Sequence, residues 1–334
     1  MTLNQADYTE SVGFKPKISV IVPIYNGEAD LPELLDCLQN QTYPAQQVEY
    51  IIVDNGSSDR TGTLLNDAVP EAKSQGITVR ALQENNIQSS YAARNTGIRA
   101  AESDILVFTD ADCRPQPDWL EFMIPPFAQA EVGLVVGEIV GLQGKTLLEK
   151  HADRNQVLSQ QHTLAHSFCP YGQTANLAIR RQALEEVGLF RPYLTTGGDA
   201  DICWRIQRET EWQLKFAPQA IVRHRHRPTI KEYKSQWRRY GRSNRYLHEL
   251  HGVELMKEKT TTEYIYLFSR WLVKELPINS LKVLAGKQPA IELIGTPIGI
   301  IGAMARSEGQ RSAKLPENAR EIEWLHNVST VSEH

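Results

Sequence analysis

The sequence predicts an α/β fold in which a mostly parallel, Rossmann-like sheet is flanked by helices. Short apolar runs alternate with helical patterns over the first 110 residues, and polar residues follow three of these runs at Asn26, Asp54 and Asp110. Such alternation is typical of parallel strands joined by helices that cover both faces of the sheet. Ligands bind beyond the carboxyl ends of such strands, so we expect the three polar residues to converge at one edge of the sheet.

The elements of the first half follow from these runs. Strands are expected at the apolar runs, residues 18–25, 48–55, 77–83 and 104–110. Helices are expected at residues 26–41, 57–69 and 89–101, where apolar residues recur at helical spacing. Asp30 and Glu33 have the spacing of a capping box, and Ser58 or Asp59 is expected to cap the second helix.

The pattern is less regular after residue 115. We expect, in order, a strand at 134–141, one or two helices at 146–168, a strand and a helix at 174–190, a helix at 199–210, and two short strands at 213–218 and 220–226. A helical extension follows these elements. Beyond about residue 306 the chain is polar, and it is expected to extend over the surface.

Composition indicates a globular protein and argues against several classes. A net charge of −4 does not favour a nucleic-acid partner. The four cysteines form no C-x-x-C pair, which argues against a zinc site or a disulfide framework and favours a reducing, cytoplasmic compartment. The first residues contain no apolar signal core, so we expect no secretion.

Two segments of the last third bear on a membrane surface. No run reaches the roughly 20 apolar residues that span a bilayer, and the nearest, residues 289–305, contains Glu292 and two prolines. This stretch is expected either to pack as a buried helix or to lie in the membrane interface. Residues 223–245 are rich in arginine and lysine, which fits a solvated face, donor phosphates or anionic lipid. Peripheral contact with the inner face of the cell membrane through residues 223–305 is therefore one expectation.

The polar strand ends each allow a structural and a functional interpretation. Tyr25 and Asn26 fit either an ordinary loop or a shelf for a nucleotide base, and neither standard glycine-rich phosphate loop is present. Asp54 fits either a turn closed by its own carboxylate or a contact to a base or ribose. Arg94, in the helix before the fourth strand, could pair with a diphosphate or with a carboxylate.

Asp110 and Asp112 end a buried strand with only Ala111 between them. Like charges repel at this separation, so a cation or firm hydrogen bonds must compensate them. Alternate residues of an extended chain point to the same side, and paired carboxylates suit Mg²⁺ or Mn²⁺. His224 and His226, expected on one face of a strand, could complete the metal shell.

A second aspartate pair, Asp199 and Asp201, follows two glycines at the start of a helix. Either carboxylate is suited to cap the helix. The other is then left over and could act as a general base in a cleft.

Taken together, these segments resemble the inverting family 2 glycosyltransferases, which have the glycosyltransferase A-type nucleotide-sugar fold. The resemblance covers roughly residues 17–245. It rests on five segments in order: SVIVPIYNGEADLPELLDCL, VEYIIVDNGSSDRT, AARNTGIRAAESDILVFTDADC, TANLAIRRQALEEVGLF and GGDADICWRIQR.

The resemblance implies a role for each matching residue. Nucleotide-sugar contacts are implied for Pro23, Tyr25, Asn26, Asp54, Arg94, Asp110 and Asn176. Metal contacts are implied for Asp112, Asp110 and His224, with His226 as a substitute. Asp199 matches the catalytic base, which leaves Asp201 as the helix cap. Acceptor or sugar contacts are implied for Gly198, Trp204, Gln236, Arg239 and Tyr240.

The implied activity is transfer of a sugar, with inversion, from a UDP-type nucleoside-diphosphate sugar to a glycan or lipid-linked hydroxyl, assisted by Mn²⁺ or Mg²⁺. Residues 236–240 read QWRRY, which resembles the Q-x-x-R-W element of polymerising members but ends in Tyr240. No multi-helix membrane pore accompanies it, so we expect one transfer per encounter.

The implied domain organisation has five parts: an N-terminal tail (1–16), a nucleotide-sugar half (17–115), an acceptor-binding and catalytic half (116–228), a helical extension (229–305) and a polar tail (306–334).

Two other functions compete with transfer. A sugar nucleotidyltransferase would carry a glycine-rich loop with a lysine after its first strand, and PIYNGEADLP has no lysine. A non-catalytic nucleotide-sugar-binding scaffold would be expected to lack a carboxylate at 110, 112 or 199, and all three are present.

Overall fold

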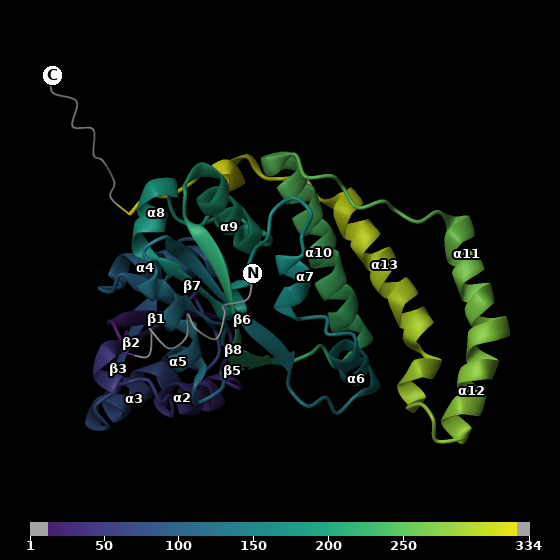
Figure 1. Cartoon of the computed structure of the whole chain (residues 1–334), viewed down its shortest axis with the longest axis horizontal. Helices are drawn as coiled ribbons and strands as arrows, with labels where there is room; N and C mark the ends of the chain where they lie inside the picture. Colours follow the sequence, from purple (N-terminus) through teal and green to yellow (C-terminus); the bar gives the residue numbers. More distant parts are fainter. Residues whose placement is uncertain (1–12, 326–334) are drawn as a thin grey trace. The chain divides into compact units, whose positions relative to one another are not determined.

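The computed structural model describes residues 13–325 and is drawn in Figure 1. Within that range the chain forms two compact units. The first contains residues 13–140, 159–224 and 316–325, and the second contains residues 141–158 and 225–315. Each is described separately below.

The first unit is built on a sheet of eight strands, counted over the described residues. They are β1 (Ile18–Ile24), β2 (Val48–Asp54), β3 (Thr78–Gln83), β4 (Ile105–Phe108), β5 (Cys113–Pro115), β6 (Val132–Gly141), β7 (Leu177–Arg180) and β8 (Gln213–His224). Their order is β3-β2-β1-β4-β7-β6-β8-β5.

The strands of the first half form parallel pairs, as predicted. Every side chain of β1 and β4 is buried, which explains why both read as unbroken apolar runs. The pairing of β1 with β4 ends at Ile21 and Phe108, whereas its pairing with β2 continues to Ile24 and Asp54. The chain after Phe108 therefore no longer pairs with β1, and Asp110 and Asp112 lie in the turn before β5.

In the second half of the sheet, β7 pairs antiparallel with both β4 and β6, and β5 pairs antiparallel with β8. The expected pair of short strands at 213–218 and 220–226 is one continuous strand, β8, because Pro218 is exposed and does not interrupt it. β8 ends at His224, so the expectation that His226 shares a strand face with His224 is wrong.

Helices connect and cover these strands. The α-helices of the first unit are α2 (Leu31–Gln39), α3 (Thr61–Ser74), α4 (Ser90–Ala100), α5 (Trp119–Met123), α7 (Gln160–Leu164), α8 (Arg181–Val187) and α9 (Gly198–Glu209). Short 3-10 turns are η1 (Ala45–Gln47), η2 (Pro125–Ala128), η3 (Thr174–Asn176) and η6 (Glu317–Arg320).

Neither of the first two helices is capped as predicted. Asp59 accepts hydrogen bonds from the Thr61 N–H (3.0 Å) and hydroxyl (2.5 Å), but Arg60 occupies the cap position of α3 and no side chain caps that helix, so the prediction of Ser58 or Asp59 as its cap is wrong. The Asp30 side chain makes no capping hydrogen bond to α2, so the predicted capping box is wrong. Instead, Asp30 and Glu33 accept hydrogen bonds from the Arg114 guanidinium at 2.9 and 2.8 Å.

The second unit is helical. It consists of α6 (Leu147–Arg154), α10 (Ile230–His251), α11 (Thr261–Arg270), the π-helical turn η4 (Trp271–Glu275), α12 (Leu276–Leu284), the 3-10 turn η5 (Ala290–Leu293) and α13 (Gly295–Ser312). Leu148, Tyr233 and Ile298 form its buried core, so α6, α10 and α13 pack together. Gly241 and Gly309 permit close packing of α10 and α13, because an added Cβ would lie about 2 Å from the opposite backbone.

The segment after residue 305 is not an extended tail from its start. The helix α13 continues to Ser312, and residues 316–325 return to the first unit. There the Glu323 carboxylate accepts hydrogen bonds from Asn95 (2.8 Å) and Arg99 (2.7 Å) on α4. Its carbonyl accepts one from the Leu189 N–H at 2.7 Å.

Candidate functional site

The loops after β1 and β2 are joined by Asn26. Its N–H donates to the Ser57 hydroxyl (2.8 Å), and its side-chain oxygen accepts from the Ser58 N–H (2.8 Å). Asn26 has a φ of +47°, a left-handed conformation that asparagine tolerates better than most residues. The predicted nucleotide contact thus coincides with a structural role, and Tyr25 beside it stands 54% exposed.

Asp54 ends β2 with its side chain largely buried. One carboxylate oxygen accepts a hydrogen bond from the Ser57 N–H at 3.0 Å, which is the turn geometry that the sequence allowed. The same turn leads into the Ser57–Asn26 contact, so Asp54 helps to fix the loop beside Tyr25. Pro23 is buried inside β1, opposite Val53 of β2.

Arg94 and Asp110 form the central ion pair of the site. The Arg94 guanidinium on α4 donates to Asp110 at 2.5 Å, and Arg94 is only 3% exposed. The guanidinium also lies over the Tyr91 ring, 5.6 Å from its centroid. Its Nε is buried and has no hydrogen-bond partner among the described residues. A buried cation with an unused donor favours a further anionic or oxygen-rich group in the site.

Asp199 lies in the first turn of α9, at the same ion pair. Thr174 donates its hydroxyl to Asp199 Oδ1 at 3.1 Å. Burial raises the pKa of the Asp199 carboxyl and Asp110 adds to the rise, while Arg94 and Thr174 oppose it. Arg94 and Asp110 are thus close enough to act electrostatically on Asp199, which remains partly exposed.

Asp201 does not cap α9, and that prediction is wrong. Gly197, with a φ of +83°, occupies the cap position, and no side chain caps the helix. Asp201 is fully buried and accepts hydrogen bonds from Arg191 (3.0 Å) and Arg205 (3.1 Å). Arg205 in turn donates to the carbonyls of Val187 and Leu189 at 2.6 and 2.7 Å. Asp201 is therefore part of the core that anchors α9.

Asp112 and His224 form a second cluster. Pairing of β5 with β8 places Cys113 opposite His224, and His224 Nε2 lies 3.3 Å from Asp112 Oδ1. Potential ligand atoms of Asp112, Cys113 and His224 all lie within 4.8 Å of one another. Burial raises the pKa of the Cys113 thiol and the two aspartates raise it further, which disfavours the thiolate form that binds a metal. Carboxylate oxygen and imidazole nitrogen are the usable donors, and they fit a divalent cation.

His226 is in the second unit, where its Nε2 lies 3.9 Å from Asp153. Of the two histidines, the geometry thus favours His224 as the partner of Asp112.

Three of the predicted contact residues are in the interior of the first unit. Asn176 is fully buried and its amide bonds to Trp119, Glu138 and Ala220. Trp204 is also fully buried and donates to the Cys169 carbonyl at 2.8 Å. The Gly198 N–H donates to the Tyr91 hydroxyl at 3.0 Å. Nothing in the geometry of Asn176 or Trp204 favours their predicted sugar contacts.

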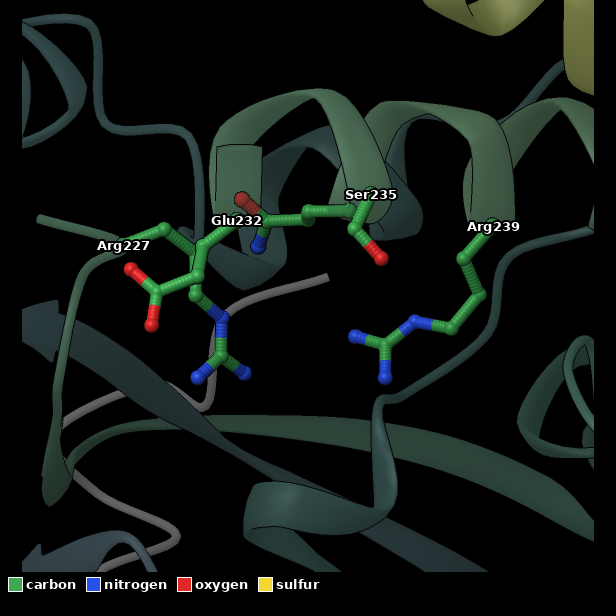
Figure 2. A pocket seen from close by; sticks show the side chains of 5 residues that line it. Arg227, Glu232, Ser235 and Arg239 are labelled. Atoms are coloured by element: carbon green, nitrogen blue, oxygen red, sulfur yellow. The ribbon is translucent and has the colours of Figure 1, made fainter. Parts of the chain in front are cut away.

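The remaining predicted contacts, Gln236, Arg239 and Tyr240, lie on α10 in the second unit. Gln236 donates to the Tyr240 hydroxyl at 3.1 Å. Arg227, Glu232, Ser235, Gln236 and Arg239 line a hollow of about 210 Å³. Figure 2 shows the Arg227 and Arg239 guanidinium groups on its two sides. The Glu232 carboxylate accepts hydrogen bonds from Thr229 at the start of α10, and two arginines line the hollow with this one carboxylate.

Two residues of the first cluster were not predicted from the sequence. Tyr91 contacts both Arg94 and Gly198, and Thr174 holds Asp199. Tyr91 precedes Arg94 by three residues, so helical spacing alone places both on one face of α4. Thr174 carried no such signal, because its contact spans 25 residues.

The two clusters together offer a carboxylate of raised pKa, a buried arginine with an unused N–H, and donors for a divalent cation. A carboxylate of this kind is suited to accept a proton, and an arginine is suited to hold an anionic leaving group.

Comparison with known proteins gives consistent matches. Residues 19–188 match the family described as Glycosyl transferase family 2, and residues 105–284 match Glycosyl transferase family group 2. The chain is similar to Glycosyltransferase AglE of Haloferax volcanii, with 34% identity over 67% of this chain and 71% of that protein. It is 28% identical to the Pre-mycofactocin glycosyltransferase of Mycobacterium tuberculosis over 68% of this chain, which spans only 46% of that relative.

Among solved structures, the mannosyltransferase PcManGT of Pyrobaculum calidifontis, in complex with GDP-Man and Mn²⁺, matches with a TM-score of 0.61 and 18% identity, over 90% of this chain and 88% of that one. S. aureus TarS, residues 1–349 with UDP-GlcNAc, matches with a TM-score of 0.50 and 17% identity, over 90% of this chain and 95% of that one. At these identities the likeness concerns the fold, and it confirms the predicted fold class.

Proposed function

The chain belongs to glycosyl transferase family 2 and is a glycosyltransferase, and from that premise we propose that it inverts the sugar configuration in a cation-assisted transfer. The donor is a nucleoside-diphosphate sugar, and the acceptor is a hydroxyl of a glycan or a lipid-linked sugar. The supporting observation is that Asp199, with its raised pKa, shares one cluster with the Arg94–Asp110 pair.

The donor contacts are assigned to the loops at the ends of β1, β2 and β4. Tyr25 has the exposure needed to stack on a nucleotide base, and Asp54 and Asn26 hold the loop beside it. The Arg94 N–H without a partner is available to a phosphate oxygen. The two structures compared above contain GDP-Man and UDP-GlcNAc, so they support the class of donor without selecting our expected UDP type.

A divalent cation, Mn²⁺ or Mg²⁺, would be held by Asp112 with Asp110 and His224. The spacing of the Asp112 and His224 ligand atoms supports this assignment, because carboxylate oxygen and imidazole nitrogen are suitable donors for such an ion. When bound, the ion supplies positive charge that neutralises the leaving diphosphate. The imidazole donor favours Mn²⁺ over Mg²⁺.

Three residues of this chain have separate roles in the transfer: one accepts a proton, one orients the acceptor of that proton, and one stabilises negative charge. Asp199 accepts the proton of the acceptor hydroxyl as its oxygen attacks the anomeric carbon opposite the leaving group, so the configuration inverts. Thr174 holds one oxygen of that carboxylate at 3.1 Å and so fixes its orientation. Arg94 stabilises the charge that develops on the diphosphate.

We further propose a role for each part of the chain. Residues 17–115 bind the donor and 116–228 position the acceptor, with the 229–305 extension and its hollow beside Gln236, Arg239 and Tyr240 offering further sugar contacts. Tyr240, in place of tryptophan, can still stack on a sugar, and we propose one transfer per encounter. None of the four cysteines is in a disulfide, which supports the predicted cytoplasmic location.

A donor panel tests this function. Purified protein is incubated with Mn²⁺ and each of several UDP- and GDP-sugars, and nucleoside diphosphate release is measured with and without glycan acceptors. We expect release from one nucleotide class, stimulated by acceptor and abolished by chelator. Synthesis of a nucleotide sugar from a nucleoside triphosphate and a sugar phosphate would instead indicate a nucleotidyltransferase. Binding of donor with no release under any condition would indicate a scaffold.

A further inference from the structure

The helical segment 261–284, formed by α11, η4 and α12, exposes an unusual number of apolar side chains. The chain stays helical through both junctions, because Trp271 and Leu276 have right-handed helical angles. No side chain in α11, η4 or α12 is buried. Those that are large, apolar and exposed are Ile265, Tyr266, Phe268, Leu272, Val273, Ile278, Leu281 and Leu284. Val273 and Leu284 are 77% and 85% exposed.

The side of this segment that faces the rest of its unit is held by polar contacts. Trp271 donates to the Leu293 carbonyl (2.8 Å), and Asn279 donates to the Glu292 carbonyl (3.2 Å). Glu275 accepts from the Thr296 hydroxyl at 2.5 Å. Within the second unit, Figure 1 shows α13 between α10 and the pair α11–α12. A surface helix normally buries its apolar face, and this segment instead leaves most of its large apolar side chains exposed.

The charge around the segment is opposite to that of the whole chain. Residues 257–287 contain six basic and three acidic residues, whereas the chain has a net charge of −4. The acids are engaged internally: Glu258 pairs with Arg311, Glu263 caps α11 through Thr260, and Glu275 contacts Arg270. Lys274, Lys282 and Lys287 are exposed among the apolar side chains.

We propose that residues 261–284 dock the protein on a lipid bilayer with anionic headgroups, with the helical segment lying in the interface. Apolar side chains would enter the acyl boundary while the lysines reach phosphate groups, the arrangement of interfacial amphipathic helices. No described helix is long and apolar enough to cross a membrane. Tyr266 is of a type that favours the headgroup region, and Phe268 suits the acyl boundary.

The proposed surface lies within residues 223–305, the range expected to contact a membrane. Of the two interpretations of residues 289–305, the structure supports the buried helix, because Ile298, Gly302 and Ala305 of α13 are buried within the second unit. The exposed apolar side chains lie instead on the preceding segment 261–284, where charged residues interrupt the apolar runs.

Flotation with vesicles tests this surface. The full chain is mixed with phosphatidylcholine vesicles, or with vesicles that contain 30 mol% phosphatidylglycerol, and the bound fraction is measured against lipid concentration. We expect binding to the anionic vesicles that weakens with salt. Val273→Glu combined with Leu284→Glu should weaken that binding by about tenfold or more, because two charged groups would enter the apolar layer. Lys274→Gln combined with Lys282→Gln should weaken it by about tenfold.

A matched control adds the same two negative charges elsewhere in the second unit. Leu147→Glu and Ile230→Glu replace exposed residues at the first positions of α6 and α10, where glutamate suits the helix dipole. This variant should retain binding within about threefold, the long-range effect of two charges. All changed positions are exposed, so circular dichroism should show the same melting temperature for every variant.

The proposal is overturned if the wild-type chain stays unbound with anionic vesicles at low salt, or if the Val273/Leu284 variant binds as well as the wild type. A wild-type dimer in light scattering that this variant dissociates, without vesicle binding, would assign the surface to a second copy of the chain. Vesicle binding is measured without sugar transfer, so this result and the donor panel fail independently.

Discussion

The sequence Asp-Ala-Asp at residues 110–112 follows a strand, whereas the same three residues at 199–201 begin a helix. In the turn after β4, both carboxylates remain partly exposed and each has its own partner, Arg94 for Asp110 and His224 for Asp112. On α9, Asp199 stays at the candidate site, while Asp201 is fully buried between two arginines. Residues two apart on a helix point about 200° apart, so one pattern serves both a site and the core.

This contrast shows why the pattern alone does not assign a role. In an extended turn both carboxylates can serve one ligand, and on a helix only one of them can. The expected effects of substituting these residues therefore differ in kind.

The largest effect is expected at Asp199. Asp199→Asn removes the proton acceptor and should lower kcat by about 10³-fold or more, with donor affinity changed only a few-fold. Because burial raises the folded pKa of Asp199, this carboxyl favours folding at low pH, and that contribution is lost as pH rises through the folded value. The melting temperature at neutral pH should therefore stay the same or rise. Retained turnover with at least tenfold weaker donor binding would reverse the assignment.

Asp112→Asn should act through the cation. We expect kcat/KM to fall about 10²-fold and to recover partly when Mn²⁺ is raised, because one ligand is lost while His224 remains. The measurement is a Mn²⁺ titration of initial rate beside the wild type. If excess chelator leaves the wild-type rate unchanged, the metal role of the whole turn is wrong.

Asp201→Asn should affect stability more than chemistry. Arg191 and Arg205 would lose their shared carboxylate in a buried setting, so the free energy of unfolding should fall by about 3 kcal/mol. Urea denaturation measures this, with rates corrected to the folded fraction. Glu33→Gln, at an exposed partner of Arg114, is the matched control and should cost less than about 1 kcal/mol. A normal stability with abolished turnover would place Asp201 in the site.

The smallest effect is expected at Thr174, on the acid side of the pH profile. Its hydroxyl favours the ionised form of Asp199, so Thr174→Val should raise the pKa of Asp199 further. We expect kcat/KM to fall by up to about fivefold on the acid side and to change little at high pH, the effect of one neutral hydrogen bond. An equal fall in kcat/KM at all pH values would show that Thr174 only orients Asp199 and does not affect its pKa.

Much of the fold was predictable because its signals are local. The buried strands β1, β2 and β4 are apolar runs, and Ser89 caps α4 where the sequence placed its start. The turn of Asp110 and Asp112 followed from its position after such a run.

The failures involve contacts between distant residues. Asp30 and Glu33 do not form the predicted capping box, because both accept hydrogen bonds from Arg114, which is more than 80 residues away in the sequence. Asn176 bonds to groups 38 to 57 residues away, so its burial had no local signal. The contact of Asp201 with Arg205 could be expected from their spacing of one helical turn. Its contact with Arg191 could not, because the path of the loop before α9 brings Arg191 to it.

The return of residues 316–325 to the first unit has a consequence for biosynthesis. Glu323 holds Asn95 and Arg99 on α4, the helix that also carries Arg94. A ribosome makes this segment only after every residue of the second unit. Domains tend to fold in the order in which they emerge from the ribosome. Here the first unit gains its contacts with residues 316–325 only after the second unit has been made. Glu323 can therefore brace the helix that carries Arg94 only after the second unit has been synthesised.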